Sequence, residues 1–371
     1  MQRVLVFVLC LVVGCCSIVE PASARRRRTV LPRWEWHLDA SLAAVYNDNL
    51  LRLSERDQDQ FQRDPGIFPV SLETTDDLET EFSLAPSLNW RAPMTLMVSG
   101  DYRIKAVTRA RNGFTDYQTH ALGVSVRPRV KGYRWSARFR VFAIPSFYLR
   151  AYRDRDWNEY HAARFSNWDY EGSVRYRVLN PLWLTAKLAW GSYYYNAKFT
   201  EYDSEYLDLT AGASYDLPWN VGISGAYTRR TSDNIGQQGG TSPTYIPSGE
   251  DPIEDTEYGD ANFNEDEFNA AVSTRIPWAS LKRVQADVSY RLRRRVYTTD
   301  RVLEQDPFHR GRLDKRGQFT TSISTPVVPK LRAQAYFTYE VRRTESEWPS
   351  VPDVKNFVRR EFGLAFSYSI R

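Results

Sequence analysis

Residues 34–46 alternate between apolar and polar side chains along most of their length, WEWHLDASLAAVY. A period of two is typical of a β-strand whose two faces meet different surroundings. The even positions form the apolar face: Trp34, Trp36, Leu38, Ala40, Leu42, Ala44 and Tyr46. The segment is about twice as long as the usual strand of 5–6 residues, so the surroundings of this long apolar face have to be identified.

Fourteen segments carry this alternation, and no helical periodicity of comparable strength competes with it. They span 34–46, 78–90, 94–106, 117–130, 133–147, 167–178, 182–194, 206–217, 219–230, 267–276, 282–296, 316–326, 330–342 and 359–370. Aromatic residues, including 23 Tyr and 11 Trp, are frequent although the mean hydropathy is only −0.54. The sequence therefore predicts an all-β chain whose strands each have one apolar face.

The connections between these segments are predicted to alternate strictly between short and long. The short ones contain the Pro, Gly and Asn that tight turns require, as in Lys131-Gly132 and Leu179–Pro181. The longest, 47–77 and 231–266, are rich in polar residues. Tight turns at one end and long polar loops at the other are typical of an up-and-down barrel in a bacterial outer membrane.

A closed barrel is also compatible with a lipid bilayer. Because it has no free strand edge, all of its backbone N–H and C=O groups can be hydrogen-bonded where there is no water. We therefore predict a transmembrane up-and-down antiparallel β-barrel of about 14 strands over 34–371, in the outer membrane of a Gram-negative bacterium. Its apolar face is expected to meet lipid, and its polar face is expected to line the interior. A soluble β-sandwich or propeller that buries the same apolar faces is the alternative fold.

Aromatic and charged residues are expected at the strand ends, where a membrane-spanning barrel meets water. Tryptophan marks the short-turn ends: Trp34, Trp36, Trp90, Trp135, Trp183, Trp219 and Trp278. Tyrosine and phenylalanine mark the long-loop ends: Tyr46, Tyr148, Tyr194, Tyr227, Phe268, Tyr290, Tyr339 and Phe362. Charges on the apolar face also fall at strand ends, from which they can reach water: Lys282, Arg294, Arg343 and Arg360.

The first residues have the pattern of a secretory signal peptide. An apolar run follows Arg3 and gives way to small residues, which predicts a signal peptide over 1–24 and a short basic tail over 25–33. A membrane anchor, or a lipidated cysteine at Cys15, is the alternative interpretation. All three cysteines lie in this leader, so no disulfide or Cys-based site is expected in the mature chain.

Charges on the polar faces are the candidates for lining a pore. A fourteen-stranded barrel is wider than the eight-stranded kind that side chains fill, so a narrow aqueous channel is expected unless loops block it. The basic candidates are Arg127, Arg129, Arg134, Arg138, Arg140, Arg175, Arg177 and Lys187. The acidic candidates are Glu35, Asp39, Glu79, Glu81 and Glu361. One basic and one acidic wall would set up an electric field across the lumen.

These opposed walls favour a porin-like channel for small polar or anionic solutes, with Trp183, Tyr193 and Tyr336 placed to stack on sugar-like molecules. A second interpretation is that the charges pair across neighbouring strands and fill the barrel with salt bridges. Two other functions stay open. One is a component of an exopolysaccharide or lipoprotein export or assembly system, and the other is a structural barrel with a closed lumen.

Other kinds of chemistry have little support in the sequence. There is no Gly-x-Ser-x-Gly nucleophile motif, no calcium-binding loop and no nucleic-acid-binding module. Two histidines lie near acidic residues in predicted long loops: His161 with Asp154 and Asp156, and His309 with Asp306 and Asp314. They leave an omptin-like protease rim as an alternative, and the acidic loop 231–266 leaves binding of a divalent ion. We predict no catalytic residues, no metal and no cofactor.

Two short stretches resemble known outer-membrane barrels. The last strand, EFGLAFSYSIR, is similar to their C-terminal assembly signal in Glu361, Gly363, Phe366 and Tyr368, although three residues follow Tyr368. VYNDNLLRL, residues 45–53, resembles the Tyr-Asp-Asp-Asn stretch of putative β-barrel porins, with Asn47 in place of the first Asp. The resemblance implies an outer-membrane barrel whose partners are membrane lipid and lipopolysaccharide, the barrel assembly machinery and small polar solutes.

Overall fold

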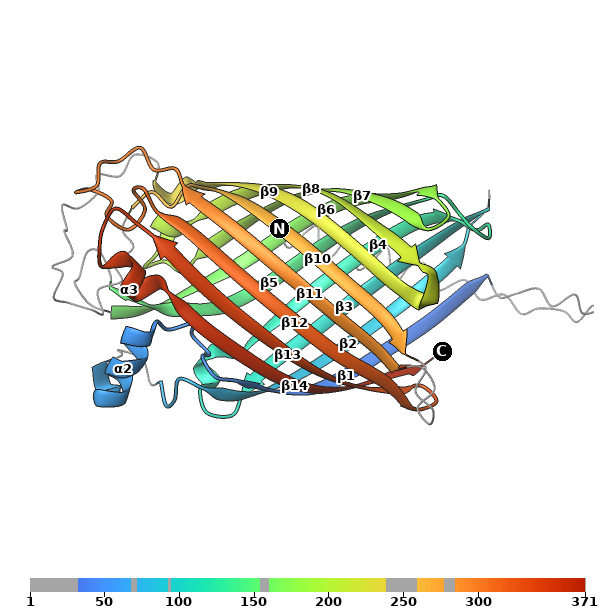
Figure 1. The fold of residues 1–371 in the computed structure, drawn as a ribbon, viewed down its shortest axis with the longest axis horizontal. Coiled ribbons are helices and arrows are strands. Elements are labelled where there is room, and N and C mark those ends of the chain that lie inside the picture. The colour runs from blue at the N-terminus through green and yellow to red at the C-terminus, as the bar shows by residue number, and fades with distance from the viewer. Residues whose placement is uncertain are drawn as a thin grey trace, which may run out of the picture. The chain divides into compact units, whose positions relative to one another are not determined.

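The computed structural model describes residues 33–67, 72–92, 95–153, 160–237, 259–276 and 284–370. The predicted signal peptide and almost all of the predicted basic tail lie outside these residues. The unit Trp34–Arg371 is a closed barrel of fourteen strands, in which each strand pairs with the next and β1 pairs with β14 (Figure 1). All fourteen pairings are antiparallel. The predicted up-and-down antiparallel barrel is confirmed.

Each strand corresponds to one predicted segment. The strands are β1 (Trp34–Asn47), β2 (Asp77–Arg91), β3 (Leu96–Arg109), β4 (Tyr117–Pro128), β5 (Trp135–Arg153), β6 (Tyr160–Leu179), β7 (Leu182–Tyr195), β8 (Ser204–Leu217), β9 (Val221–Asn234), β10 (Phe263–Ile276), β11 (Val284–Tyr297), β12 (Leu313–Val328), β13 (Leu331–Glu345) and β14 (Phe357–Ile370). Most begin or end a few residues beyond the prediction at the end that carries the longer connections. We call this end the upper end, and the end with the tight turns the lower end.

The alternation of long and short connections is only partly as predicted. The upper connections 48–76, 235–262, 298–312 and 346–356 are long, but 110–116, 154–159 and 196–203 are short. Strands β5 and β6, at 19 and 20 residues, continue upward through residues that were predicted to form a loop. They are held there by a small core in which Tyr152 and Ala163 pack with Phe199 and Tyr202. His161 consequently lies on β6 and not in a loop.

The outer wall of the barrel is apolar and the inner wall is polar, as predicted. On β1 the even positions point outward, and Leu42 remains 53% exposed although it is apolar. Trp34 and Trp90 stack on the outer wall at the lower end, with ring centroids 5.5 Å apart. An apolar outer wall of this kind is expected to contact the lipid of the membrane.

Two residues predicted for the outer aromatic bands point inward. Trp183 is 8% exposed and lies beneath arginine side chains of the lumen. Tyr148 is 2% exposed and lines an interior cavity. Irregular pairing on either side of Tyr148, between Ile144 and Phe147 and again before Arg150, interrupts the simple alternation along β5. Trp278 lies outside the described residues.

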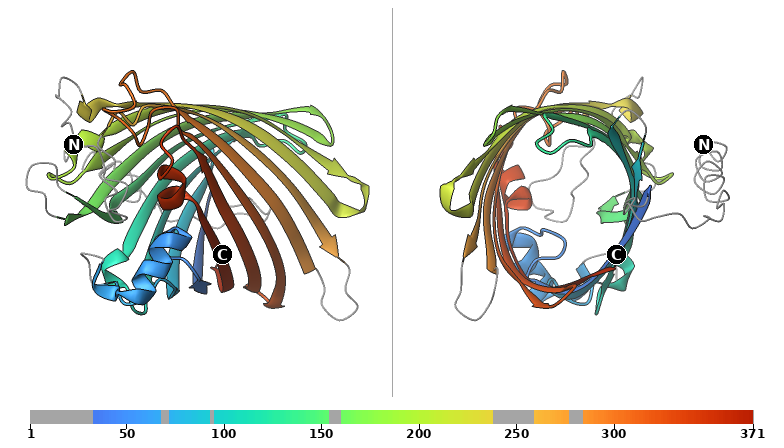
Figure 2. Two further views of the ribbon diagram at one scale, coloured as in Figure 1. Left: turned by 60° about the vertical axis from the view of Figure 1, so that its left-hand side comes forward. Right: turned by 90° about the vertical axis from the view of Figure 1, so that its right-hand side faces the viewer.

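Short helices lie at the upper end (Figures 1 and 2). Helix α2 (Glu55–Arg63) begins with a capping box between Ser54 and Asp57, and helix α3 (Val351–Lys355) precedes β14. Leu53 and Phe61 pack with Leu72 to anchor the connection between β1 and β2. Among the described residues, no helix has the length and apolar character needed to cross a membrane.

Candidate functional site

The upper half of the lumen contains a cavity of about 350 Å³, which we call the upper-lumen cavity. Its lining comes from the upper ends of β3 and β5–β14 and from several upper connections. Cationic side chains in this lining are Arg52, Arg109, Arg150, Arg230, Arg295, Arg312, Arg316, Arg342 and Lys355. Aromatic side chains are Phe147, Tyr148, Tyr152, Phe165, Tyr193, Tyr195, Tyr202, Phe263, Tyr297 and Phe357.

Two of these arginines are held by carboxylates directly opposite them on the adjacent strand. Arg230 on β9 donates through two nitrogens to both carboxylate oxygens of Asp208 on β8, each at 2.7 Å. Arg295 on β11 pairs with Glu265 on β10 at 2.9 Å. Neither carboxylate is part of the cavity lining, whereas both guanidinium groups are. The cavity therefore meets the positive member of each pair.

Two carboxylates each serve more than one arginine. Asp314 accepts from Arg312 at 3.1 Å and from Arg342 at 2.7 Å. Glu340, which is 2% exposed, pairs with Arg316 and lies 3.6 Å from Arg52 and 3.4 Å from Arg359. Because each of these carboxylates is shared by more than one arginine, each cluster keeps an excess of positive charge.

Arg52 reaches the cavity from the connection after β1, and the VYNDNLLRL stretch builds that position. Asn49 accepts from the backbone N–H of Leu53 at 2.8 Å and donates to the carbonyls of Leu53 and Val358 at 2.8 and 2.9 Å. The backbone of Arg52 is left-handed, with φ at 54°. Burial lowers the pKa of Arg52, and the nearby charge of Arg359 lowers it further, while Glu340 opposes the shift. A guanidinium nevertheless stays protonated at neutral pH.

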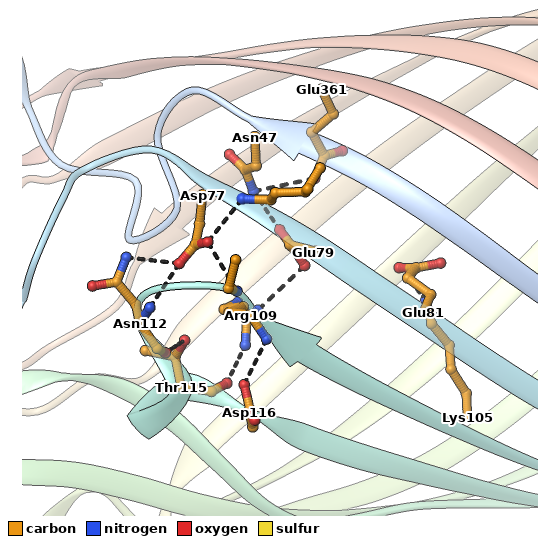
Figure 3. A network of polar contacts seen from close by, with 12 residues as sticks. Asn47, Asp77, Glu79, Glu81, Lys105, Arg109, Asn112, Thr115, Asp116 and Glu361 are labelled. Carbon is orange, nitrogen blue, oxygen red and sulfur yellow. Dashed lines mark hydrogen bonds and ion pairs between the residues drawn. The ribbon is translucent and has the colours of Figure 1, made fainter.

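A second network fixes Arg109 at the top of β3 (Figure 3). Glu79 accepts from Asn47 at 2.8 Å and lies 3.5 Å from Arg109, which also donates to the carbonyl of Thr115. Asp77 accepts from the backbone N–H and the side chain of Asn112, each at 2.8 Å. Because the turn after β3 is clamped to β2 in this way, the guanidinium group of Arg109 has little freedom to move.

Aromatic side chains dominate the part of the cavity formed by β5, β6 and β7. Phe165 lies between Phe147 and Tyr193, with ring centroids 5.3 and 5.2 Å away. On the cationic side, rings lie against guanidinium groups, as where Arg295 sits 3.7 Å from the ring centroid of Phe263. Rings predominate on β5–β7, which we call the aromatic sector although Arg150 lies on β5. Guanidinium groups predominate on β9 and β11–β13, which we call the cationic sector although Tyr297 lies on β11.

Several of the predicted pore-lining residues are paired with oppositely charged residues of adjacent or next-but-one strands. Lys187 lies 3.6 Å from Glu171, and Arg138 pairs with Asp101 at 2.8 Å. The predicted acidic residues have partners too: Glu35 with Arg91, Glu81 with Lys105 at 2.6 Å, Glu79 with Arg109, Glu361 with Arg359, and Asp39 with the hydroxyl of Ser369 at 2.5 Å. For these residues the structure has the cross-strand and local pairing that was the alternative interpretation, and there is no bare acidic wall.

Other predicted basic residues lie against aromatic rings. Arg175 and Arg177 approach Trp183 to 4.8 and 4.3 Å from its ring centroid, and Arg127 lies 4.9 Å from that of Tyr133. Arg140 lies over Phe142 in the same way, at 5.3 Å. Arg129 and Arg134 are exposed in the turn between β4 and β5, because β4 ends at Pro128 and β5 begins at Trp135. The predicted basic group therefore clusters around the lower half of the lumen.

The stronger cationic sector, at the upper end, was missed from the sequence. Its signal was present in the alternation of RLRRR at 291–295, which places Arg291, Arg293 and Arg295 on one face of β11. No alternating pattern marked Arg52 or Arg312, because both lie in connections between strands. Tertiary contacts decide that these connections turn into the lumen.

The remaining predicted features are structural or lie outside the described residues. His309 is 1% exposed and its ring lies 2.8 Å from Asp306, which also accepts from the backbone N–H of Asp260. These contacts hold two upper connections together. In the acidic loop, Glu265 and Asp266 are paired with Arg295 and Arg229, while residues 238–258 lie outside the described residues.

No protein-family model and no curated protein matches this sequence. Among solved structures, OprD of Pseudomonas aeruginosa is 12% identical, with 91% of this chain and 95% of that chain covered and a TM-score of 0.40. An anion-selective porin from Comamonas acidovorans is 9% identical, with 91% and 99% covered and a TM-score of 0.43. A bacterial polysaccharide outer membrane secretin is 8% identical, with 90% and 98% covered and a TM-score of 0.43. Likenesses this distant carry no argument about function, and the barrel is established by its own strand pairing.

Proposed function

We propose that this chain is a non-enzymatic channel of the bacterial outer membrane that passes small polar solutes and prefers anions. The location is supported by the closed barrel with an exposed apolar outer wall, since only a closed set of strands satisfies its backbone in lipid. Contact with lipid and lipopolysaccharide, and insertion by the barrel assembly machinery, follow from this location and stay predictions.

The observation that carries the anion preference is which charges line the upper-lumen cavity. The guanidinium groups of Arg230 and Arg295 are part of its lining, whereas their carboxylate partners Asp208 and Glu265 are not. A solute in the cavity is therefore closer to the positive charges than to the negative ones. Because electrostatic interactions are stronger near low-dielectric walls than in bulk water, this order of charges favours anions.

The proposal is tested by the ion selectivity of the purified protein in planar bilayers. Arg52 and Arg342 are the residues to change, because Glu340 and Asp314 each retain another arginine when one is removed. The double substitution Arg52→Gln/Arg342→Gln should lower the ratio of anion to cation permeability without leaving a carboxylate unpaired.

A matched control removes the same charge from the outer wall. Arg294 and Arg343 are exposed on the outward faces of β11 and β13, so Arg294→Gln/Arg343→Gln should leave the selectivity unchanged. A wild-type protein without conductance, or one that prefers cations, would refute the proposed function. An equal loss of selectivity in both double variants would refute the role of the cavity.

A further inference from the structure

We propose that the upper-lumen cavity binds small aromatic carboxylates, with the ring against the aromatic sector and the carboxylate on the cationic sector. The inference rests on the proposed function, since it names the class of anion that the channel selects. It depends on three features of the cavity: the separation of its two sectors, the donors that have no partner, and the lack of carboxylate and amide side chains in the described lining.

The two sectors face each other across the lumen. In the closed strand order, β6 and β13 lie half of the fourteen-strand circuit apart. Phe165 is on β6 within the aromatic sector, and Arg342 is on β13 within the cationic sector. A ligand that contacts both needs an apolar ring at one end and a negative charge at the other. A simple inorganic anion would use only one of the two.

The cationic lining of the cavity contains donors that the described protein leaves unused, in the cationic sector and beside it on β3. The Nε groups of Arg342 on β13 and Arg109 on β3 are buried and have no hydrogen-bond partner among the described residues. The side chain of Arg109 is only 7% exposed, so bulk water is a poor substitute for a partner. A carboxylate offers two oxygens to such donors and forms the strongest class of hydrogen bond with guanidinium groups.

The aromatic sector has one unused donor as well. The hydroxyl of Tyr148 is buried and has no hydrogen-bond partner in the described part of the chain, and Tyr148 is 2% exposed. Its ring meets Phe114 edge to face, with centroids 4.9 Å apart, which fixes its orientation. A ring substituent such as a hydroxyl or methoxy oxygen would supply the acceptor that Tyr148 lacks.

The composition of the lining separates aromatic acids from sugar acids. Among the described residues, the lining includes no Asp, Glu, Asn or Gln side chain, and its side-chain oxygen acceptors are hydroxyl groups such as those of Ser204 and Ser232. A sugar needs acceptors for its several hydroxyl donors, and a buried donor without an acceptor is costly. An aromatic carboxylate has no such donors on its ring and is matched by rings and cations alone. The volume of about 350 Å³ is at the small end for a ligand site, which suits a single-ring acid.

The experiment is calorimetric titration of the purified full chain in detergent with benzoate, acetate, benzyl alcohol and glucuronate. Benzoate should bind at least about tenfold more tightly than acetate, which lacks the ring, and than benzyl alcohol, which lacks the charge. Acetate or benzyl alcohol binding as tightly as benzoate would overturn the inference, and so would tighter binding of glucuronate.

Variants place the site. Phe165→Leu should weaken benzoate binding and leave acetate binding unchanged, whereas Arg52→Gln/Arg342→Gln should weaken both. The outer-wall control Arg294→Gln/Arg343→Gln should bind benzoate like the wild type, and a loss in this control would overturn the assignment to the cavity.

Heat-modifiable migration on gels shows whether each variant is folded. If Phe165→Leu fails to fold, Tyr148→Phe replaces it, with weaker binding expected for 4-hydroxybenzoate and unchanged binding for benzoate.

Failure of this inference and failure of the proposed function give different results. An anion-selective channel that binds benzoate no better than acetate refutes the inference alone. A protein that binds benzoate as described but conducts no ions, or prefers cations, refutes the proposed function and leaves the binding site in place.

Discussion

Arg230 and Asp208 form a two-point ion pair across β8 and β9, with both hydrogen bonds at 2.7 Å. The side chains are 22% and 15% exposed, and the guanidinium group also lies 4.0 Å from the ring centroid of Tyr206. The pair holds the arginine at the cavity surface. The same ion pair therefore contributes both to the stability of the barrel wall and to the positive charge of the lumen.

Removing only the carboxylate of this pair should destabilise the barrel. Asp208→Ala leaves a mostly buried guanidinium without its partner, and we expect a loss of about 1–3 kcal/mol in unfolding free energy. The double variant Asp208→Ala/Arg230→Ala should recover part of that loss, because no unpaired charge remains. Urea unfolding in lipid vesicles measures both. If the double variant were as unstable as the sum of two single variants, the two residues would not act as a pair.

Gly363 on β14 should tolerate no side chain. It faces inward, and an added Cβ would fall on the ring of Tyr336 on the neighbouring β13. Gly363→Ala should therefore cost about 1–3 kcal/mol or prevent assembly, as other overpacked substitutions do. Gly100 on β3 is the matched control, because nothing lies within 4 Å of its added Cβ. Heat-modifiable migration should be lost or weakened in Gly363→Ala and retained in Gly100→Ala.

A charged substitution on the outer wall, near the middle of a strand, should destabilise the barrel. Leu42 points outward near the middle of β1 and is 53% exposed, so Leu42→Arg would place a guanidinium in the hydrocarbon and cost about 2–4 kcal/mol. Ser41→Arg on the opposite face of the same strand meets the polar lumen and should cost much less. Unfolding from vesicles compares the two. Equal costs would mean that the wall beside Leu42 does not face lipid.

The architecture could be predicted from the sequence because a barrel wall depends on a local rule. Residues on one strand alternate between lipid and lumen, so β1 and β14 are recognisable from their own residues without knowledge of their neighbours. The same rule placed Arg138 and Lys187 on the inner face, but it does not predict their partners. Those partners depend on strand register and on side-chain reach. The register aligns Asp101 with Arg140 through Gly123, yet Arg138 contacts the Asp101 carboxylate from two strands away.

The upper-lumen cavity could not be predicted, because it depends on chain that leaves the alternating pattern. Arg52 enters the lumen from a connection, held by Asn49, and Tyr148 turns inward where the pairing of β5 with β6 is irregular. Neither position follows from a period of two. Loop course and strand irregularity are decided by contacts between distant residues, such as Asn49 with the carbonyl of Val358.

Asp203 is expected to make the stability of the barrel depend on pH. It lies outside the strands, just before β8, and accepts from the backbone N–H of Tyr195 at 2.7 Å. Burial raises the pKa of Asp203 above its ordinary value, and the hydrogen bond from Tyr195 only partly opposes this shift. Because the folded state holds the proton more tightly than the unfolded state, this group's contribution to the unfolding free energy falls as pH rises through the folded pKa.

The substitution Asp203→Asn should remove that pH dependence. Asparagine keeps an oxygen acceptor for Tyr195 and carries no charge, so the variant should be at least as stable as the wild type at neutral pH. Urea unfolding between mildly acidic and neutral pH measures the difference. A variant that loses stability at neutral pH would show that the ionised carboxylate stabilises the fold, opposite to the expected sign.

Asn49 should control the width of the lumen, because its side chain holds the segment that carries Arg52 in place. Asn49→Ala removes three hydrogen bonds of 2.8–2.9 Å and should release this segment from the wall at Val358. Single-channel recording should then show larger and noisier conductance with weaker anion preference. The control is Asp48→Asn, beside it in sequence. Asp48 accepts from the backbone N–H of Arg360 at 2.6 Å and from its guanidinium at 3.2 Å; asparagine keeps one oxygen acceptor, so the variant should conduct like the wild type. Unchanged conductance in folded Asn49→Ala would mean that the segment does not restrict the path of ions.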